Sequence, residues 1–186
     1  MTTTAERDAL ISVLCQSWHW DSNDEHMIIF EAGGTGQLIS RAEMNVWIAS
    51  QFIWKALDST SAAVSRNQLC IEMQLTETRV PPWDSPSFTG RINEQVLTRE
   101  AFVPKLYVIT LERGTFLTSL DTQYKHKGGP EYSFQMTFDR SPYPPREEWR
   151  EPEGGPETLK IWEKKTFCAG KIEGGEKKSW FKNLFQ

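Results

Sequence analysis

Several features of membrane, secreted and nucleic-acid-binding proteins are missing from this 186-residue chain. No apolar run approaches the ~20 residues that cross a membrane as a helix, and the first residues, 1–8, are polar rather than an apolar signal region. The three cysteines, Cys15, Cys70 and Cys168, are widely spaced and odd in number, which favours reduced thiols in a cytoplasmic protein. With 21 basic and 25 acidic side chains the net charge is −4, so a nucleic-acid partner is not expected.

Sequence motifs for cofactors and common catalytic sites are also missing. The chain has no Gly-rich dinucleotide or P-loop motif, no HExxH or CxxC, and no GxSxG. The glycines of segment 33–36 lie between two expected strands, where a hairpin turn needs them. We therefore expect no cofactor and no metal, and the sequence identifies no catalytic residue.

Alternating apolar and polar residues dominate what is present. In segment 69–76 the apolar residues occupy every second position, and segment 132–139 repeats this pattern. Further strands are expected at 18–20, 27–30, 36–41, 46–57, 106–111 and 159–167. Because the linkers are too short to hold crossover helices, neighbouring strands should be antiparallel. The pattern predicts an all-β domain of about 8–9 strands, closed as a barrel or packed as a sandwich.

The remaining segments complete a single domain, 1–186. Segment 1–15 is expected to form a short N-terminal helix. Segment 141–157 is rich in proline and glycine and is expected to be an extended, mobile loop. Segment 171–186 carries aromatic residues among lysines and is a candidate for a short amphipathic C-terminal helix that caps the barrel, contacts a membrane surface or binds a partner.

The opening third of the chain resembles lipocalin-like (calycin) barrels. The resemblance is carried by segments 15–21 (CQSWHWD), 27–36 (MIIFEAGGTG) and 52–55 (FIWK). The chain is also similar to small β-barrel proteins of filamentous fungi with a Ser-Pro-Tyr-Pro-Pro segment such as 141–145. The resemblance implies an up-and-down barrel with an internal apolar cavity, and a role in secondary metabolism.

Aromatic residues are the one enriched class, with 8 tryptophans in the chain. Two expected strands, 46–57 and 106–111, are apolar on both faces, so one face of each can border a lumen. A polar residue inside such a strand needs a hydrogen-bond partner, which a ligand could supply. The candidate ligand-binding residues are Trp20, Trp47, Gln51, Trp54, Tyr107 and Tyr132.

Polar residues between positions 19 and 26 are candidates for metal binding or acid–base chemistry. His19, Asp21, Asp24 and His26 are close in sequence and are potential metal ligands, but the same residues are typical of a turn. His26, next to an apolar strand, is also a candidate acid or base.

Three functional hypotheses therefore stay open. The first is a cofactor-free cyclase, isomerase or dehydratase acting on an apolar metabolite, and the second is a carrier or sensor with the same cavity. The third is a protein-interaction module that uses segment 141–157 and the C-terminal residues. The sequence indicates neither the ligand nor the oligomeric state.

Overall fold

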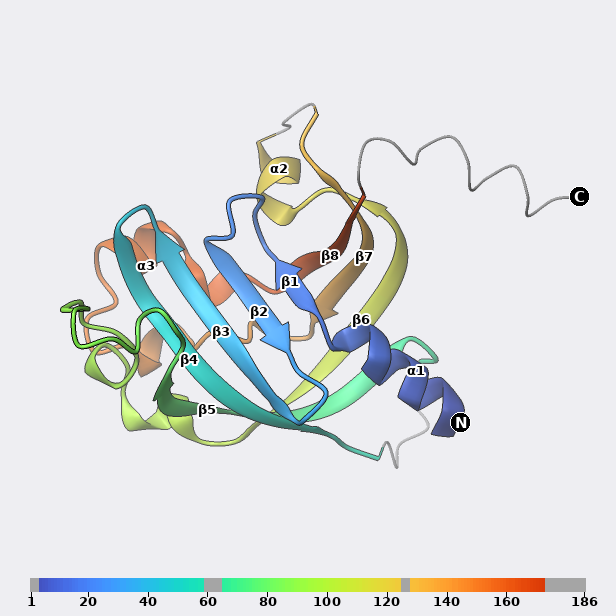
Figure 1. The fold of residues 1–186 in the computed structure, drawn as a ribbon, viewed down its shortest axis with the longest axis horizontal. Helices are drawn as coiled ribbons and strands as arrows, with labels where there is room; N and C mark the ends of the chain where they lie inside the picture. The colour runs from blue at the N-terminus through green and yellow to red at the C-terminus, as the bar shows by residue number, and fades with distance from the viewer. Residues whose placement is uncertain (1–3, 59–64, 125–127, 173–186) are drawn as a thin grey trace, which may run out of the picture.

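Eight antiparallel strands close into a barrel in chain order (Figure 1). The computed structural model describes residues 4–58, 65–124 and 128–172. The strands are β1 (Ser17–His19), β2 (His26–Phe30), β3 (Thr35–Ala42), β4 (Asn45–Ala56), β5 (Gln68–Arg79), β6 (Lys105–Phe116), β7 (Glu131–Phe138) and β8 (Thr166–Ile172). The prediction of an all-β domain is confirmed, and the strands form one closed ring rather than the two sheets of a sandwich.

The helices are short and lie around the barrel. They are α1 (Thr4–Leu14), α2 (Ser119–Gln123) and α3 (Gly155–Thr158), with 3-10 turns η1 (Asn93–Gln95), η2 (Arg99–Phe102), η3 (Arg146–Glu148) and η4 (Ile161–Glu163). The predicted N-terminal helix is thus confirmed. Among the described residues, no helix has the length and apolar character to cross a membrane.

The last strand begins later than predicted. We expected it at 159–167, but residues 159–160 form a turn after α3, residues 161–163 form η4, and β8 begins at Thr166. Lys160 has a left-handed backbone (φ 47°), which ends any extended conformation at that point. The apolar residues that suggested a strand instead place one side chain, Ile161, in the core.

The barrel interior is filled largely by apolar side chains that alternate along the strands. On β5, residues Leu69, Ile71, Met73 and Leu75 are buried while the residues between them are partly exposed. Aromatic rings continue this core across the barrel, in contacts between Phe30 and Phe52, Phe30 and Trp54, Tyr107 and Phe138, and Phe138 and Phe167. Strand β2 contributes Ile28 and Phe30 to this core, and His26 is buried on the same face of the strand.

The proline-rich segment 141–157 packs against the barrel. It contains η3 and the first residues of α3. The hydroxyl of Tyr143 donates a 2.7 Å hydrogen bond to the carbonyl of Ile39, and the indole N–H of Trp149 donates to the carbonyl of Pro144 at 2.9 Å. Both rings are nearly fully buried. The segment therefore contributes to the core instead of forming the extended loop that its composition predicts. Of segment 171–186, where a C-terminal helix was expected, residues 171–172 belong to β8 and residues 173–186 lie outside the described residues.

The ring closes through a short contact. Strand β1 has three residues and pairs with β8 at one position, His19 with Cys168. Each other pair of neighbours is joined at three or more positions in the described part of the chain.

Candidate functional site

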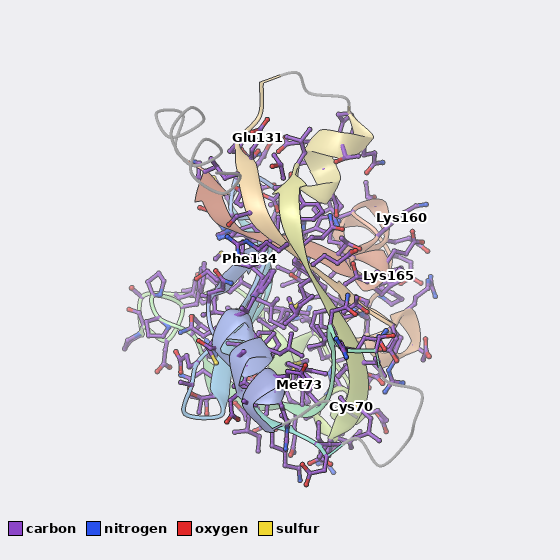
Figure 2. The ribbon with its side chains drawn as sticks, turned by 90° about the vertical axis from the view of Figure 1, so that its right-hand side faces the viewer. Cys70, Met73, Glu131, Phe134, Lys160 and Lys165 are labelled. Atoms are coloured by element: carbon purple, nitrogen blue, oxygen red, sulfur yellow. The ribbon has the colours of Figure 1, made fainter. Side chains whose placement is uncertain are left out.

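A hollow of about 460 Å³ lies at one end of the barrel. Three elements meet there: the β1–β2 turn, α2 (Figure 1), and the connection from α3 to β8, on which Figure 2 shows Lys160 and Lys165. Its walls include Trp20, Leu120, Tyr124 and Leu159. The buried polar residues His26 and Lys164 also line it, as do Glu25, Gln123, Thr158, Lys160 and Glu163. The volume lies within the roughly 300–1,000 Å³ typical of small-molecule sites.

Hydrogen bonds fix α2 against the end of β1. The backbone N–H of Leu120 donates to the carbonyl of Trp20 at 3.3 Å. The Ser22 hydroxyl donates to the Asp121 carboxylate at 3.4 Å, and Thr118 caps the helix by accepting from the Asp121 N–H at 3.2 Å. Such a cap satisfies a backbone donor that the short helix leaves free. The wall that carries Leu120 is therefore tied to the strand that precedes Trp20.

His26 is buried at the start of β2, with 2% of its surface exposed. Its Nδ1 atom lies 3.1 Å from the Ser40 hydroxyl, and its ring meets the rings of Trp20 and Tyr143 nearly edge-on, with centroids 5.5 and 6.2 Å away. Burial, aided by the positive charge of Lys164, lowers the pKa of His26 to about 3. The imidazole is therefore neutral at physiological pH.

Lys164 brings a buried amine to the same hollow. Its side-chain Nζ donates a 2.7 Å hydrogen bond to the Leu159 carbonyl and lies 3.5 Å from the centroid of the Trp20 ring. The residue is 5% exposed. Burial lowers the pKa of Lys164 to about 8, although the charges of Asp21 and Glu163 act in the opposite direction.

Asp21 organises the turn between β1 and β2. Its carboxylate is fully buried and accepts backbone N–H bonds from Asn23, Glu25 and His26 at 2.9, 3.0 and 2.8 Å. Burial raises the pKa of Asp21, and these three N–H groups partly oppose the rise. The carboxylate thus holds the start of β2 and supplies a negative charge that acts on Lys164.

The four residues weighed as metal ligands do not gather at one point. His19 Nδ1 lies 2.7 Å from the Asp24 carboxylate, while Asp21 binds backbone N–H groups and His26 contacts Ser40. Within residues 4–58, 65–124 and 128–172, no group of three or more His, Cys, Asp or Glu side chains is arranged to hold a metal ion.

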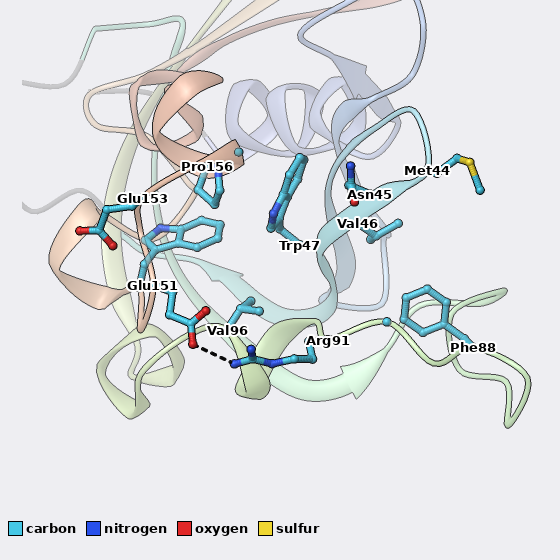
Figure 3. Close-up of a pocket in the computed structure, with 13 residues that line it drawn as sticks. Met44, Asn45, Val46, Trp47, Phe88, Arg91, Val96, Glu151, Glu153 and Pro156 are labelled. Carbon is cyan, nitrogen blue, oxygen red and sulfur yellow. Dashed lines mark hydrogen bonds and ion pairs between the residues drawn. The ribbon is translucent and has the colours of Figure 1, made fainter.

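A second hollow, of about 320 Å³, lies over β4. Figure 3 shows Trp47 facing Pro156, with Val96 and the ion pair between Arg91 and Glu151 beside them. The charged side chains here are well exposed, at 60% for Arg91 and 73% for Glu151. It therefore lacks the buried polar groups that distinguish the first hollow.

The six residues predicted to bind a ligand are distributed over the molecule. Trp20 lines the first hollow and Trp47 the second. Trp54 borders a third, smaller hollow of about 120 Å³, and its indole N–H donates to the carbonyls of Glu31 and Thr35. These three tryptophans therefore do not share one cavity.

The other three predicted residues have partners within the protein. The Gln51 side-chain amide donates to the Arg79 carbonyl at 3.2 Å, so the expectation that a ligand supplies its partner is wrong. Tyr107 is buried against Phe138, and Tyr132 is buried with its ring stacked on His19.

Sequence reasoning found Trp20 and His26 but missed Lys164. A lysine next to a second lysine, Lys165, is usually a solvent-exposed residue. The one available signal is that Lys164 lies between the apolar residues Ile161 and Phe167, both of which are buried.

The described residues define a class of protein: an all-β chain whose eight antiparallel strands close into a ring, with a hollow at one end that contains buried polar groups. Comparisons with protein-family models, with curated proteins and with solved structures find no match to this chain.

Proposed function

We propose that this protein binds an apolar small molecule in the hollow at the α2 end of the barrel. The supporting observation is that two buried polar groups, His26 and Lys164, converge on one indole ring, that of Trp20. Small-molecule sites usually combine apolar rings of this kind with a few placed polar groups. The lipocalin-like resemblance of the first third of the chain supports the same proposal.

The arrangement favours a ligand with an apolar body and one oxygen-bearing end. The body packs against Trp20, Leu120 and Leu159, which line the hollow. The oxygen accepts a hydrogen bond from Lys164, whose three donors include one already directed to the Leu159 carbonyl. The three cysteines are free, which fits our proposal of a cytoplasmic protein.

Turnover without a cofactor is the catalytic form of this proposal. A neutral His26 can accept a proton from a bound molecule, and a protonated Lys164 can stabilise negative charge that develops on its oxygen. Proton transfer of this kind serves a cyclisation, an isomerisation or a dehydration. A carrier with the same hollow would release its ligand unchanged, so product analysis after incubation separates the two forms.

Binding is tested by titration of tryptophan fluorescence with cinnamyl alcohol, cinnamic acid and farnesol. Trp20→Phe removes the indole that contacts both polar groups, and we expect it to weaken binding at least about tenfold, the equivalent of 1.4 kcal/mol. Trp47→Phe alters the second hollow instead and is the matched control. If Trp47→Phe weakens binding and Trp20→Phe does not, the proposed location is contradicted. If none of the three probes binds, the proposed function is contradicted.

A further inference from the structure

We propose that Lys164 forms an imine with an aldehyde or ketone that carries an apolar group. This inference rests on the proposed function, because the carbonyl compound must first occupy the hollow at the α2 end of the barrel. It assigns a covalent role to Lys164, which is buried at the hollow, unlike the other lysines that the structure describes.

The amine is held in a defined place at the hollow. Its Nζ atom is fixed between the Leu159 carbonyl, at 2.7 Å, and the face of Trp20, whose centroid is 3.5 Å away. Leu159 and Trp20 both line the hollow. A carbonyl compound packed on Trp20 is therefore brought next to the nitrogen, and such positioning greatly raises the effective concentration of one reactant at the other.

The lowered pKa of the Lys164 amine also favours this reaction at neutral pH. Only the neutral amine is a nucleophile, and a pKa of about 8 leaves roughly a quarter of Lys164 neutral at pH 7.5. An ordinary lysine, with a pKa near 10.4, has roughly 200-fold less neutral amine at that pH. The charges that act on Lys164 are those of Asp21 and Glu163, and the neutral imidazole of His26 lines the same hollow.

The reaction is balanced with the groups present. The neutral amine adds to the carbonyl carbon, the C–N bond forms, and the oxygen takes up the proton lost by nitrogen. This carbinolamine then takes up a proton from solvent and expels its hydroxyl group as water, and the iminium nitrogen releases its remaining proton to solvent. The net change converts one amine and one carbonyl group into one imine and one water, and no oxidant or reductant is needed.

The experiment uses the full chain, trans-cinnamaldehyde and sodium cyanoborohydride, which donates hydride to the imine and makes the bond permanent. Tandem mass spectrometry of peptides then gives the labelling rate at each lysine in the unmodified sequence, so no variant has to fold. We expect Lys164 to be labelled at least about tenfold faster than its exposed neighbour Lys165 at pH 7.5, because the Lys164 amine lies at the hollow and its pKa is lowered.

Two variants and one analogue complete the design. Lys164→Arg keeps the positive charge but removes the nucleophile, and we expect it to abolish the fast labelling, while Lys165→Arg leaves that labelling intact. Cinnamyl alcohol has no carbonyl group, so its binding reports the hollow alone. If the alcohol binds and Lys164 reacts no faster than Lys165, the imine proposal is overturned and the proposed function stands. If neither the alcohol nor the aldehyde binds, the imine proposal is overturned, and the proposed function fails as well if cinnamic acid and farnesol also do not bind.

Discussion

The ammonium group of Lys164 lies face-on to Trp20, with its Nζ atom 3.5 Å from the centroid of the indole ring. The two residues come from opposite ends of the chain, and the closure of β1 onto β8 brings these regions together. A cation on an aromatic face is stabilised by the ring, most strongly where water is excluded. Here burial has the larger effect, because the pKa of Lys164 is lowered and not raised.

Replacement of Lys164 by methionine should change how stability depends on alkaline pH. The folded-state pKa of about 8 lies below the ordinary value near 10.4, so the unfolded chain binds more protons between these limits. Folding of the unmodified protein should therefore gain about 1–2 kcal/mol relative to Lys164→Met as the pH rises from 8 to 10. Urea unfolding of both proteins across this range measures the difference, in which the tyrosines common to both cancel. If the free energies of unfolding of the two proteins change equally with pH, burial does not disfavour the charged form of Lys164.

His26 should govern stability on the acid side. Its folded-state pKa of about 3 is below the ordinary 6.5, so its contribution is complete above pH 6.5 and is lost as the pH falls toward 3. Relative to His26→Gln, the protein should lose about 2 kcal/mol between pH 6.5 and 4.5. Asp21, Glu25, Tyr143 and Lys164 are present in both proteins, so the comparison isolates the imidazole. Chemical denaturation at three pH values between 4.5 and 6.5 measures this change. If the difference in free energy of unfolding between the two proteins does not vary with pH, His26 is not held buried and neutral.

Asp21→Asn should destabilise the protein although it changes few atoms. The aspartate accepts from three backbone N–H groups, and an asparagine places its own N–H₂ against one of these donors. We expect a loss of about 1–3 kcal/mol in the free energy of unfolding at pH 7, the usual range for an unsatisfied buried group. Asp84→Asn, at an exposed position, is the control. An equal effect of the two substitutions would exclude a special role for Asp21.

Gly36→Ala tests the tight packing of the β2–β3 hairpin. A Cβ atom on Gly36 would overlap the Phe52 ring and the backbone carbonyl of Ile29. Because a backbone atom cannot move aside cheaply, we expect a loss of about 1–3 kcal/mol in thermal or chemical unfolding. Gly33 in the same turn has no atom within 4 Å of such a Cβ, so Gly33→Ala should be close to neutral. If both substitutions behave alike, the hairpin is less tightly packed than the structure indicates.

The alternating strands were predictable because the period of two reports a half-buried surface directly. On β5 and β7 the residues expected in the core are buried or nearly so, including Met73 and Phe138. The start of β8 was not predictable, because Leu159 and Ile161 fit a strand equally well until the left-handed conformation of Lys160 is known. Local pattern alone does not distinguish a 3-10 turn with one buried residue from a short strand.

The sequence predicted two residues of the candidate site, Trp20 and His26, but not the third, Lys164. Trp20 directly follows β1 and His26 begins β2, and both stand out by residue type. Lys164 reaches them through ring closure, which no short-range pattern encodes, and its side chain is of the type most often found in solvent. The expected lumen residues Tyr107 and Tyr132 are instead buried against aromatic neighbours, since aromatic side chains fill a core as readily as they line a cavity.

The brief junction of β1 with β8 also affects access to the interior. These two strands are paired at one position, fewer than any other neighbours in the described part of the chain, so we expect this junction to separate most easily. Trp20 directly follows β1, so such a separation would widen the hollow sideways without unfolding the other strands. A ligand larger than the hollow would then enter between β1 and β8. The backbone amides of these two strands should exchange with deuterium faster than the amides between β3 and β4.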